Sequence, residues 1–202
     1  MMKRIGITGP TGAGKTTALQ ALEELGALIL DADAVYHRLL EENGSMCQAL
    51  TQRFGSGILG EDGKLDRKKL GGVVFGDPAA LEDLNGITHG FIGRALEEEM
   101  ARAEEEGRPA AAIDAIALIE SGLAAECEAV VGILAPAEVR VKRIMARDHI
   151  GEDYARARVA AQKDEAFYRA HCTHILENNE NDTPETFRRR ALALFRGLLE
   201  GD

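Results

Sequence analysis

Short apolar runs alternate with helical patterns at the start of the chain. The run 4–8 is followed by a glycine-rich turn and by segment 15–25, in which leucines recur every three residues. Gly26 marks the expected end of that helix, and 27–30 is predicted to be a second strand ending at Asp31. Strand, turn, helix and strand in this order form the unit from which parallel sheets are built.

The same alternation returns in the second half of the chain. Strands are predicted at 110–114, 129–134 and 174–177, and helices at 138–147, 151–169 and 187–199. The segment from about 34 to 107 has no convincing long β run. It is mainly helical in pattern, with turn signals at 43–44, 55–57 and 62–63. We therefore expect a helical block inserted into an α/β core, without a flexible linker.

Composition narrows the class of protein. The 202 residues include 24 Lys and Arg against 34 Asp and Glu, which gives a net charge of −10, and 45% are apolar. This balance is typical of a soluble globular chain. An acidic surface argues against nucleic acid or an anionic membrane as partner, although a local cationic site can still bind an anionic substrate. No apolar run approaches a membrane helix in length. Three well-separated cysteines without a CxxC pair predict free thiols in a reducing cytoplasm.

The segment from Gly9 to Thr16 is the strongest chemical signal. It reads GPTGAGKT and matches the phosphate-binding pattern G-x-x-x-x-G-K-[ST], and it lies between a predicted strand and a predicted helix. Its backbone N–H groups and the helix N-terminus can bind phosphate oxygens. Lys15 can reach the β and γ phosphates, and the Thr16 hydroxyl can ligate Mg²⁺. The alternative is a glycine turn that matches the pattern by chance. The strand and helix predicted on either side of the segment disfavour that alternative.

Acidic residues follow two of the predicted strands. Asp31 and Asp33 come at the end of the second strand, where open α/β sheets bind ligands. One carboxylate can take the proton of an attacking hydroxyl, and the other can hold a metal-bound water. Asp114 ends another apolar run and can orient Mg²⁺ through water. For each of the three, capping the next helix is the structural alternative.

Arginines follow the fourth predicted strand, at 143, 147, 156 and 158. Guanidinium groups that close over the phosphates would stabilise the charge of phosphoryl transfer and exclude water. A solvated basic helix is the alternative, and Arg147 is the strongest single candidate. From these residues alone we expect a Mg²⁺-ATP phosphotransferase acting on a small hydroxyl substrate. Another P-loop kinase for a nucleoside or sugar, or a nucleotide hydrolase acting as a switch, stays open; the absence of Asn-Lys-x-Asp weighs against GTP.

Taken together, the motifs resemble the dephospho-coenzyme A kinase family over nearly the whole chain. The matching segments, in the family's order, are 7–17, Asp31-Ala32-Asp33, 63–67, 74–75, 84–89, 114–123, Arg143 to Asp148, 158–162 and Asn178. Two departures stand out. The family usually has Pro after the histidine, where this chain has Gly90, and its Asp-x-Pro-Leu-Leu-Phe-Glu is replaced by DAIALIE at 114–120. Both fall in regions that would hold the acceptor.

The resemblance implies a three-layer α/β/α P-loop kinase with a five-stranded parallel sheet. Residues 1–33 and 108–202 would form the nucleotide-binding core, with a lid at about 143–162, and 34–107 the acceptor-binding insertion. It implies transfer of the ATP γ-phosphate to the ribose 3′-hydroxyl of dephospho-coenzyme A. Mg²⁺ as the companion of ATP and a cytoplasmic location are the expectations already drawn from the residues. The oligomeric state is not implied.

The resemblance also implies roles for individual residues. Asp33 would be the general base, Lys15 the phosphate clamp, and Arg143 and Arg147 lid residues, which gives the catalytic set. Residues expected to bind ATP are Gly9, Gly12, Ala13, Gly14, Lys15, Thr16, Thr17 and Asn178, the last near the adenine. Residues expected to bind the acceptor are Asp31, Asp33, Asp66, Arg67, His89 and Asp114.

Overall fold

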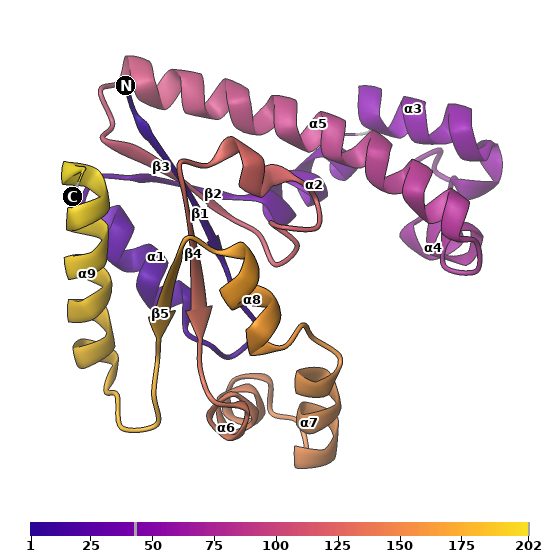
Figure 1. Ribbon diagram of the computed structural model, residues 1–202. Helices are drawn as coiled ribbons and strands as arrows, with labels where there is room; N and C mark the ends of the chain where they lie inside the picture. The colour runs from indigo at the N-terminus through magenta and orange to yellow at the C-terminus, as the bar shows by residue number, and fades with distance from the viewer. Residues whose placement is uncertain (43, 202) are drawn as a thin grey trace. The chain divides into compact units, whose positions relative to one another are not determined.

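The chain divides into two compact units in the computed structural model, which describes residues 1–42 and 44–201 (Figure 1). The first unit comprises Met1–Leu30 and Arg102–Asp202, and the second Asp31–Ala101. The first residue of the predicted 43–44 turn lies outside the described residues. The second unit is a single continuous stretch of chain, whereas the first is assembled from two separate stretches.

A five-stranded parallel sheet organises the first unit, which confirms the predicted fold class. Its strands are β1 (Lys3–Thr8), β2 (Leu28–Asp31), β3 (Ala110–Asp114), β4 (Ala129–Leu134) and β5 (His174–Glu177). The spatial order is β2-β3-β1-β4-β5, so the first strand is central. Ile5 is paired with Ala112 on one side and with Ala129 on the other. A central β1 places the glycine-rich loop that follows it in the middle of one sheet edge.

The helices of this unit are α1 (Lys15–Glu24), α6 (Ala137–Asp148), α7 (Glu152–Ala160), α8 (Glu165–His171) and α9 (Pro184–Glu200), with a 3₁₀ turn η2 (Leu123–Glu126). The single helix predicted over 151–169 is wrong, because the chain forms two helices there. Asp164 has an extended backbone, and its carboxylate accepts a hydrogen bond from the Phe167 N–H at 2.9 Å. This N-cap starts α8 as a new helix.

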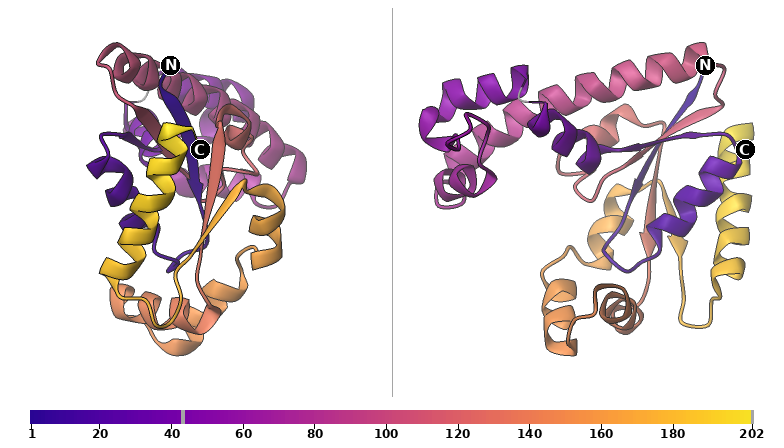
Figure 2. Two further views of the ribbon diagram at one scale, coloured as in Figure 1. Left: turned by 60° about the vertical axis from the view of Figure 1, so that its left-hand side comes forward. Right: turned by 180° about the vertical axis from the view of Figure 1, so that it is seen from behind.

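Different elements cover the two faces of the sheet. α1 and α9 lie side by side on one face (Figure 2), and their core includes Ile5, Ile7, Leu22, Phe187 and Phe195. On the other face the strands carry small residues. A Cβ at residue 6 would lie 2.6 Å from Leu118, and one at residue 132 would lie 2.9 Å from the Cys172 sulfur. Glycine at these positions therefore lets the 115–128 segment and α8 approach the sheet closely.

The second unit is helical. It contains α2 (Ala32–Glu41), α3 (Ser45–Phe54), a 3₁₀ turn η1 (Ser56–Ile58), α4 (Arg67–Val74) and most of α5 (Pro78–Glu105). Its own core is formed by aliphatic side chains that include Leu40, Leu50, Ile58, Leu70 and Val74. Separate cores in the two units agree with the two-unit division.

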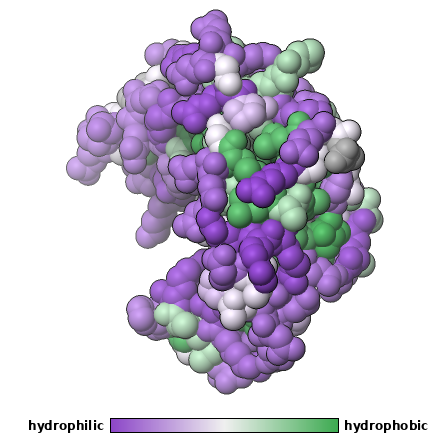
Figure 3. Space-filling view, turned by 90° about the vertical axis from the view of Figure 1, so that its left-hand side faces the viewer, coloured by the Kyte–Doolittle hydropathy of each residue, from purple (hydrophilic) through white to green (hydrophobic). Residues whose placement is uncertain are grey.

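Few large apolar side chains are exposed among the described residues: Met1, Val73, Phe75, Leu81, Ile116 and Tyr154. The face shown in Figure 3 is mainly hydrophilic, with apolar side chains gathered in a few groups. Among the described residues, no helix is long and apolar enough to cross a membrane. The cysteines at 47, 127 and 172 are free, and burial raises the pKa of the Cys127 and Cys172 thiols to about 11. These two thiols are therefore protonated and weakly nucleophilic at neutral pH.

The long helix α5 includes glycines at 86, 90 and 93, and a Cβ at any of them would meet nothing within 4 Å. Glycine in a helix interior costs about 0.5–1 kcal/mol relative to alanine. We expect Gly90→Ala to raise the free energy of unfolding by about that amount, measured by urea denaturation. Gly86→Ala is the matched comparison. A lower stability for both variants would contradict the helical geometry of this segment.

Candidate active site

The loop between β1 and α1 requires glycine at both of its ends. Gly9 has a φ of +141°, and a Cβ there would lie 2.2 Å from the Ile133 carbonyl oxygen. Gly14, the residue before α1, has a φ of +109°, and a Cβ there would lie 2.3 Å from the side-chain nitrogen of Asn178. A side chain at either position would displace the loop from the sheet edge.

The carbonyl side of the loop is held by side chains from elsewhere in the chain. Asn178 donates from Nδ2 to the Ala13 carbonyl at 2.9 Å. Arg143 donates from Nη1 to the Gly12 and Ala13 carbonyls at 3.3 and 3.4 Å, and from Nη2 to the Asn178 Oδ1 at 3.1 Å. Because a trans peptide is planar, fixing the Ala13 carbonyl turns the Gly14 N–H in the opposite direction.

The N–H groups at the start of α1 are available for an anion. Among the residues that the structure describes, the N–H groups of Gly14, Lys15 and Thr16 have no acceptor within the protein. These are the unsatisfied donors of a helix N-terminus, and the helix dipole adds partial positive charge there. The arrangement can bind phosphate oxygens without a further device.

The Lys15 ammonium lies at the carboxyl end of β3. Its Nζ donates to the Asp114 Oδ1 at 2.9 Å, and the two side chains are only 17% and 18% exposed. The carboxylate of Asp114 is therefore paired with the loop lysine. Phosphate oxygens entering the loop would compete with Asp114 for the same ammonium.

Asp31 has the structural role of a helix cap, which was the alternative to a functional role. It is the N-cap of α2, and its Oδ1 accepts from the Ala34 N–H at 2.9 Å. Asp33 lies in the first turn of the same helix. A cap formed by Asp31 fixes the start of α2, the helix whose first turn contains Asp33. The catalytic role of Asp33 stays a prediction.

The residues expected to bind the acceptor occur at different places in the helical unit. Asp66 caps α4, accepting from the N–H groups of Lys69 at 3.1 Å and Lys68 at 2.9 Å, and these bonds lower the pKa of its carboxyl. Arg67 is the first residue of α4. His89 lies within α5, and its partial burial lowers the pKa of the imidazole. A neutral imidazole can donate or accept a hydrogen bond.

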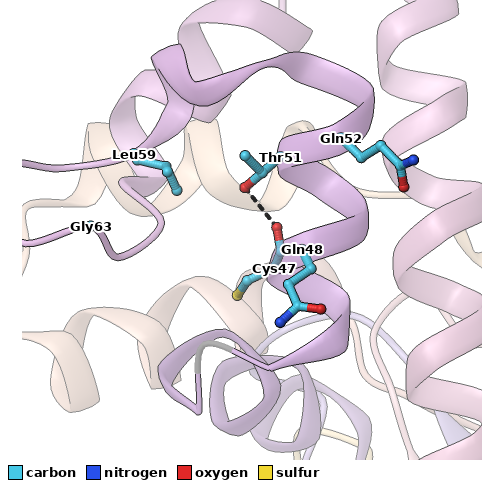
Figure 4. Close-up of a pocket in the computed structure, with 6 residues that line it drawn as sticks. All are labelled: Cys47, Gln48, Thr51, Gln52, Leu59 and Gly63. Atoms are coloured by element: carbon cyan, nitrogen blue, oxygen red, sulfur yellow. Dashed lines mark hydrogen bonds between the residues drawn. The ribbon is translucent and has the colours of Figure 1, made fainter.

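A cavity of about 450 Å³ in the helical unit lies beside α3 (Figure 4). Its lining consists of Cys47, Gln48, Thr51, Gln52, Leu59 and Gly63. The Thr51 hydroxyl donates to the Cys47 carbonyl at 2.8 Å, as the dashed line in the figure shows. This lining carries amides and a hydroxyl but no charged side chain, so it suits a neutral polar group better than a phosphate.

The arginines predicted to form a lid have different partners. Arg143 is bonded to the phosphate-binding loop, as described above. Arg147 is exposed and forms a two-point contact with Asp148, at 2.6 and 3.0 Å. Hydrogen bonds from Arg147 and then Arg158 lower the pKa of Asp148 to about 2. Arg156 is paired with Glu138 and Glu152 at the surface. The structure therefore brings Arg143, and not Arg147, to the loop.

Sequence reasoning missed Arg140, which is buried on α6 and donates to the Thr11 carbonyl at 3.0 Å. It also donates to Gln162, which lies in segment 158–162 of the family resemblance. The helical pattern places residues 140, 143, 144 and 147 on one face of a helix, but it does not show that this face meets the loop.

The residues present fit Mg²⁺ bound together with a nucleotide. Thr16 is exposed in the first turn of α1, where its hydroxyl can serve as a hard oxygen ligand. Among the described residues, no cluster of three or more acidic, His or Cys side chains forms a metal site by itself. This donor set is typical of Mg²⁺ that takes its remaining ligands from phosphates and water.

Comparison with known proteins shows the family of this chain. Residues 3–184 match the family model for dephospho-CoA kinase. A dephospho-CoA kinase from Anaeromyxobacter dehalogenans is 38% identical over 200 residues, which cover 99% of this chain and 94% of the relative. A crystal structure of a Thermus thermophilus protein aligns with a TM-score of 0.76 at 31% identity over 98% of both chains. The dephospho-CoA kinase of Campylobacter jejuni aligns with a TM-score of 0.68 at 27% identity, over 100% of this chain and 99% of that one. The chain therefore belongs to the dephospho-CoA kinase family of ATP-dependent kinases.

Proposed function

We propose that this chain transfers the γ-phosphate of ATP to the ribose 3′-hydroxyl of dephospho-coenzyme A, which completes coenzyme A biosynthesis. The observation that carries the proposal is the loop lysine, held at 2.9 Å from Asp114. Beside it are N–H groups of a helix N-terminus that have no acceptor among the described residues. This arrangement suits the triphosphate of ATP, and membership of the family supplies the acceptor.

In the proposed reaction, Lys15 binds the β and γ phosphates while the N–H groups of the loop hold their oxygens in place. Asp33 takes the proton of the acceptor hydroxyl as its oxygen forms a bond to the γ-phosphorus. The bond from that phosphorus to the bridging oxygen breaks, and ADP leaves. Arg143 and Arg147 contribute positive charge to the transferred group.

We infer that Mg²⁺ binds with ATP through the Thr16 hydroxyl. When bound, the ion neutralises part of the phosphate charge. Asn178 lies under the loop, 5% exposed, with its amide engaged by Ala13 and Arg143. Beside its proposed place near the adenine, it would therefore keep the phosphate-binding loop in shape.

We further infer that the helical unit binds the acceptor through Asp66, Arg67 and His89, with Asp31 and Asp114 at the ends of their strands. The same unit also contains the cavity beside α3, whose lining has no charged side chain. This assignment rests on the family and on the presence of charged and hydrogen-bonding side chains there.

The test is ADP release from Mg²⁺-ATP with dephospho-coenzyme A, adenosine or water as the acceptor. We expect release to depend on dephospho-coenzyme A and the product to carry a 3′-phosphate, detected by mass. Faster release with adenosine would favour a nucleoside kinase. Release at the same rate without any acceptor would favour a nucleotide hydrolase.

The segment from about Arg143 to Gln162 is expected to become ordered when nucleotide binds. Within α7 only Ala155 is buried among the described residues, so few apolar contacts hold this helix down. Hydrogen exchange should slow there when ATP and acceptor are added. Arg147→Ala should lower turnover, and Arg147→Lys should lower it less, because lysine keeps the charge but loses the planar fork. Unchanged hydrogen exchange together with normal turnover of Arg147→Ala would mean that these arginines only lie on a solvent-exposed helix face.

A further inference from the structure

Arg140 is a buried cation with no carboxylate partner in the part of the chain that the structure describes. Its residue is 7% exposed, and burial lowers the pKa of the guanidinium. Among the described residues, no Asp or Glu lies within salt-bridge distance of it; its hydrogen bonds go to two neutral oxygens. Burying a charged group with only neutral partners is costly, so a residue in this setting calls for an explanation.

The two neutral oxygens belong to a closed ring of hydrogen bonds around Thr11. Arg140 donates from Nε to the Thr11 carbonyl at 3.0 Å and from Nη2 to the Gln162 Oε1 at 2.5 Å. The same Oε1 accepts the Thr11 N–H at 3.1 Å. Both backbone polar groups of one residue in the phosphate-binding loop are therefore held by two side chains, one from α6 and one from the turn that follows α7.

This ring sets the direction of the next peptide group in the loop. The Thr11 carbonyl and the Gly12 N–H belong to one planar trans peptide and point in opposite directions. Because Arg140 holds the carbonyl, the Gly12 N–H is turned away from α6. Arg143 and Asn178 do the same for the Ala13 carbonyl and the Gly14 N–H. Without the ring, the Thr11 peptide could rotate and lose that orientation.

We propose that Arg140 and Gln162 are positioning residues that clamp Thr11 and hold the phosphate-binding loop in the form that receives ATP. The inference rests on the proposed function only in so far as the loop binds a nucleotide. It also explains the buried charge: a guanidinium with neutral partners leaves a positive potential at the loop, which the phosphates offset. Gln162 is the last residue of the segment proposed as a lid, so movement of that segment would change the hydrogen bond between Gln162 and the Thr11 N–H.

The test compares Arg140→Gln, Gln162→Ala and the double variant by calorimetric affinity for ADP and by the KM for ATP. Each single change should weaken ADP binding and raise the ATP KM about tenfold, the loss expected for one hydrogen bond to a charged group. The KM for dephospho-coenzyme A should change less than twofold. Either change breaks the ring. The loss of ADP affinity in the double variant should therefore be about as large as the larger of the two single losses. Arg140→Lys should recover part of the affinity.

Lys142→Ala is the matched control. It removes a cation from the same helix, but its side chain is 71% exposed and pairs with Glu180. We expect its ADP affinity to stay within about twofold of the parent, as for other exposed ion pairs. If Arg140→Gln fails to fold, Gln162→Ala alone decides, because Gln162 lies outside the cores of the two units.

The inference is overturned if folded Arg140→Gln and Gln162→Ala bind ADP like the parent protein. It is also overturned if the losses of ADP affinity in the two single variants add up in the double variant. Two residues that act independently would give that result. Failure of the proposed function is a different result, in which the parent protein binds ADP but transfers no phosphate to dephospho-coenzyme A. In that case the ADP affinities still decide the role of the ring.

Discussion

Lys15→Ala is expected to lower the rate of phosphoryl transfer by about a hundredfold or more, which is the typical loss of one electrostatic contact to the transition state. The ammonium stabilises phosphate charge only when nucleotide is bound, so the fold should survive. Turnover with saturating ATP and acceptor is the measurement. Near-normal turnover in the purified variant would mean that this loop is not the ATP site.

The control for this variant follows from the Lys15–Asp114 pair. Removing the lysine alone leaves a carboxylate that is 18% exposed without its cation. Such an unpaired group costs stability by itself. The double variant Lys15→Ala/Asp114→Asn removes both charges. It should be at least as stable as Lys15→Ala and equally inactive, which separates the loss of phosphate binding from a loss of stability.

Asp33→Asn is expected to lower turnover by about 10²–10⁴-fold, the usual loss on removing a general base. Asparagine has the same shape but cannot accept the proton of the acceptor hydroxyl. The affinity for ATP, measured separately, should change little. Loss of ATP affinity with normal turnover at saturation would instead make Asp33 a metal-binding or structural residue. Asp31 or Asp114 would then be the better candidate for the base.

The sheet could be predicted because its strands are short apolar runs followed by turn or helix signals. The break between α7 and α8 could not, since the 151–169 pattern stays helical through Asp164, and only the capping bond to Phe167 shows that a new helix begins. An aspartate at the start of a helix looks the same in sequence whether it caps the helix or meets a substrate.

Within the site, the phosphate-binding loop could be found because a local spacing encodes it. The partners of that loop could not, because they are distant in sequence. Arg140 is 129 residues from Thr11, and Asn178 is 165 residues from Ala13. A helical pattern places Arg140 on the same face as Arg143, but it does not show that this face meets the loop. Such contacts depend on the order of the strands, and only the structure gives it.

The insertion of the helical unit has a consequence for how the chain folds. β2 and β3 are neighbours in the sheet, although residues 32–109 separate them along the chain. Closing so long a loop costs little at equilibrium, since each doubling of length adds only about 0.6 kcal/mol. The rate is affected more, because long-range pairing is slow whereas helices with local contacts form quickly. The edge strand β2 should therefore join a sheet whose other strands have already paired, and the order of assembly would leave the Asp33 segment among the last parts of the protein to reach its native place.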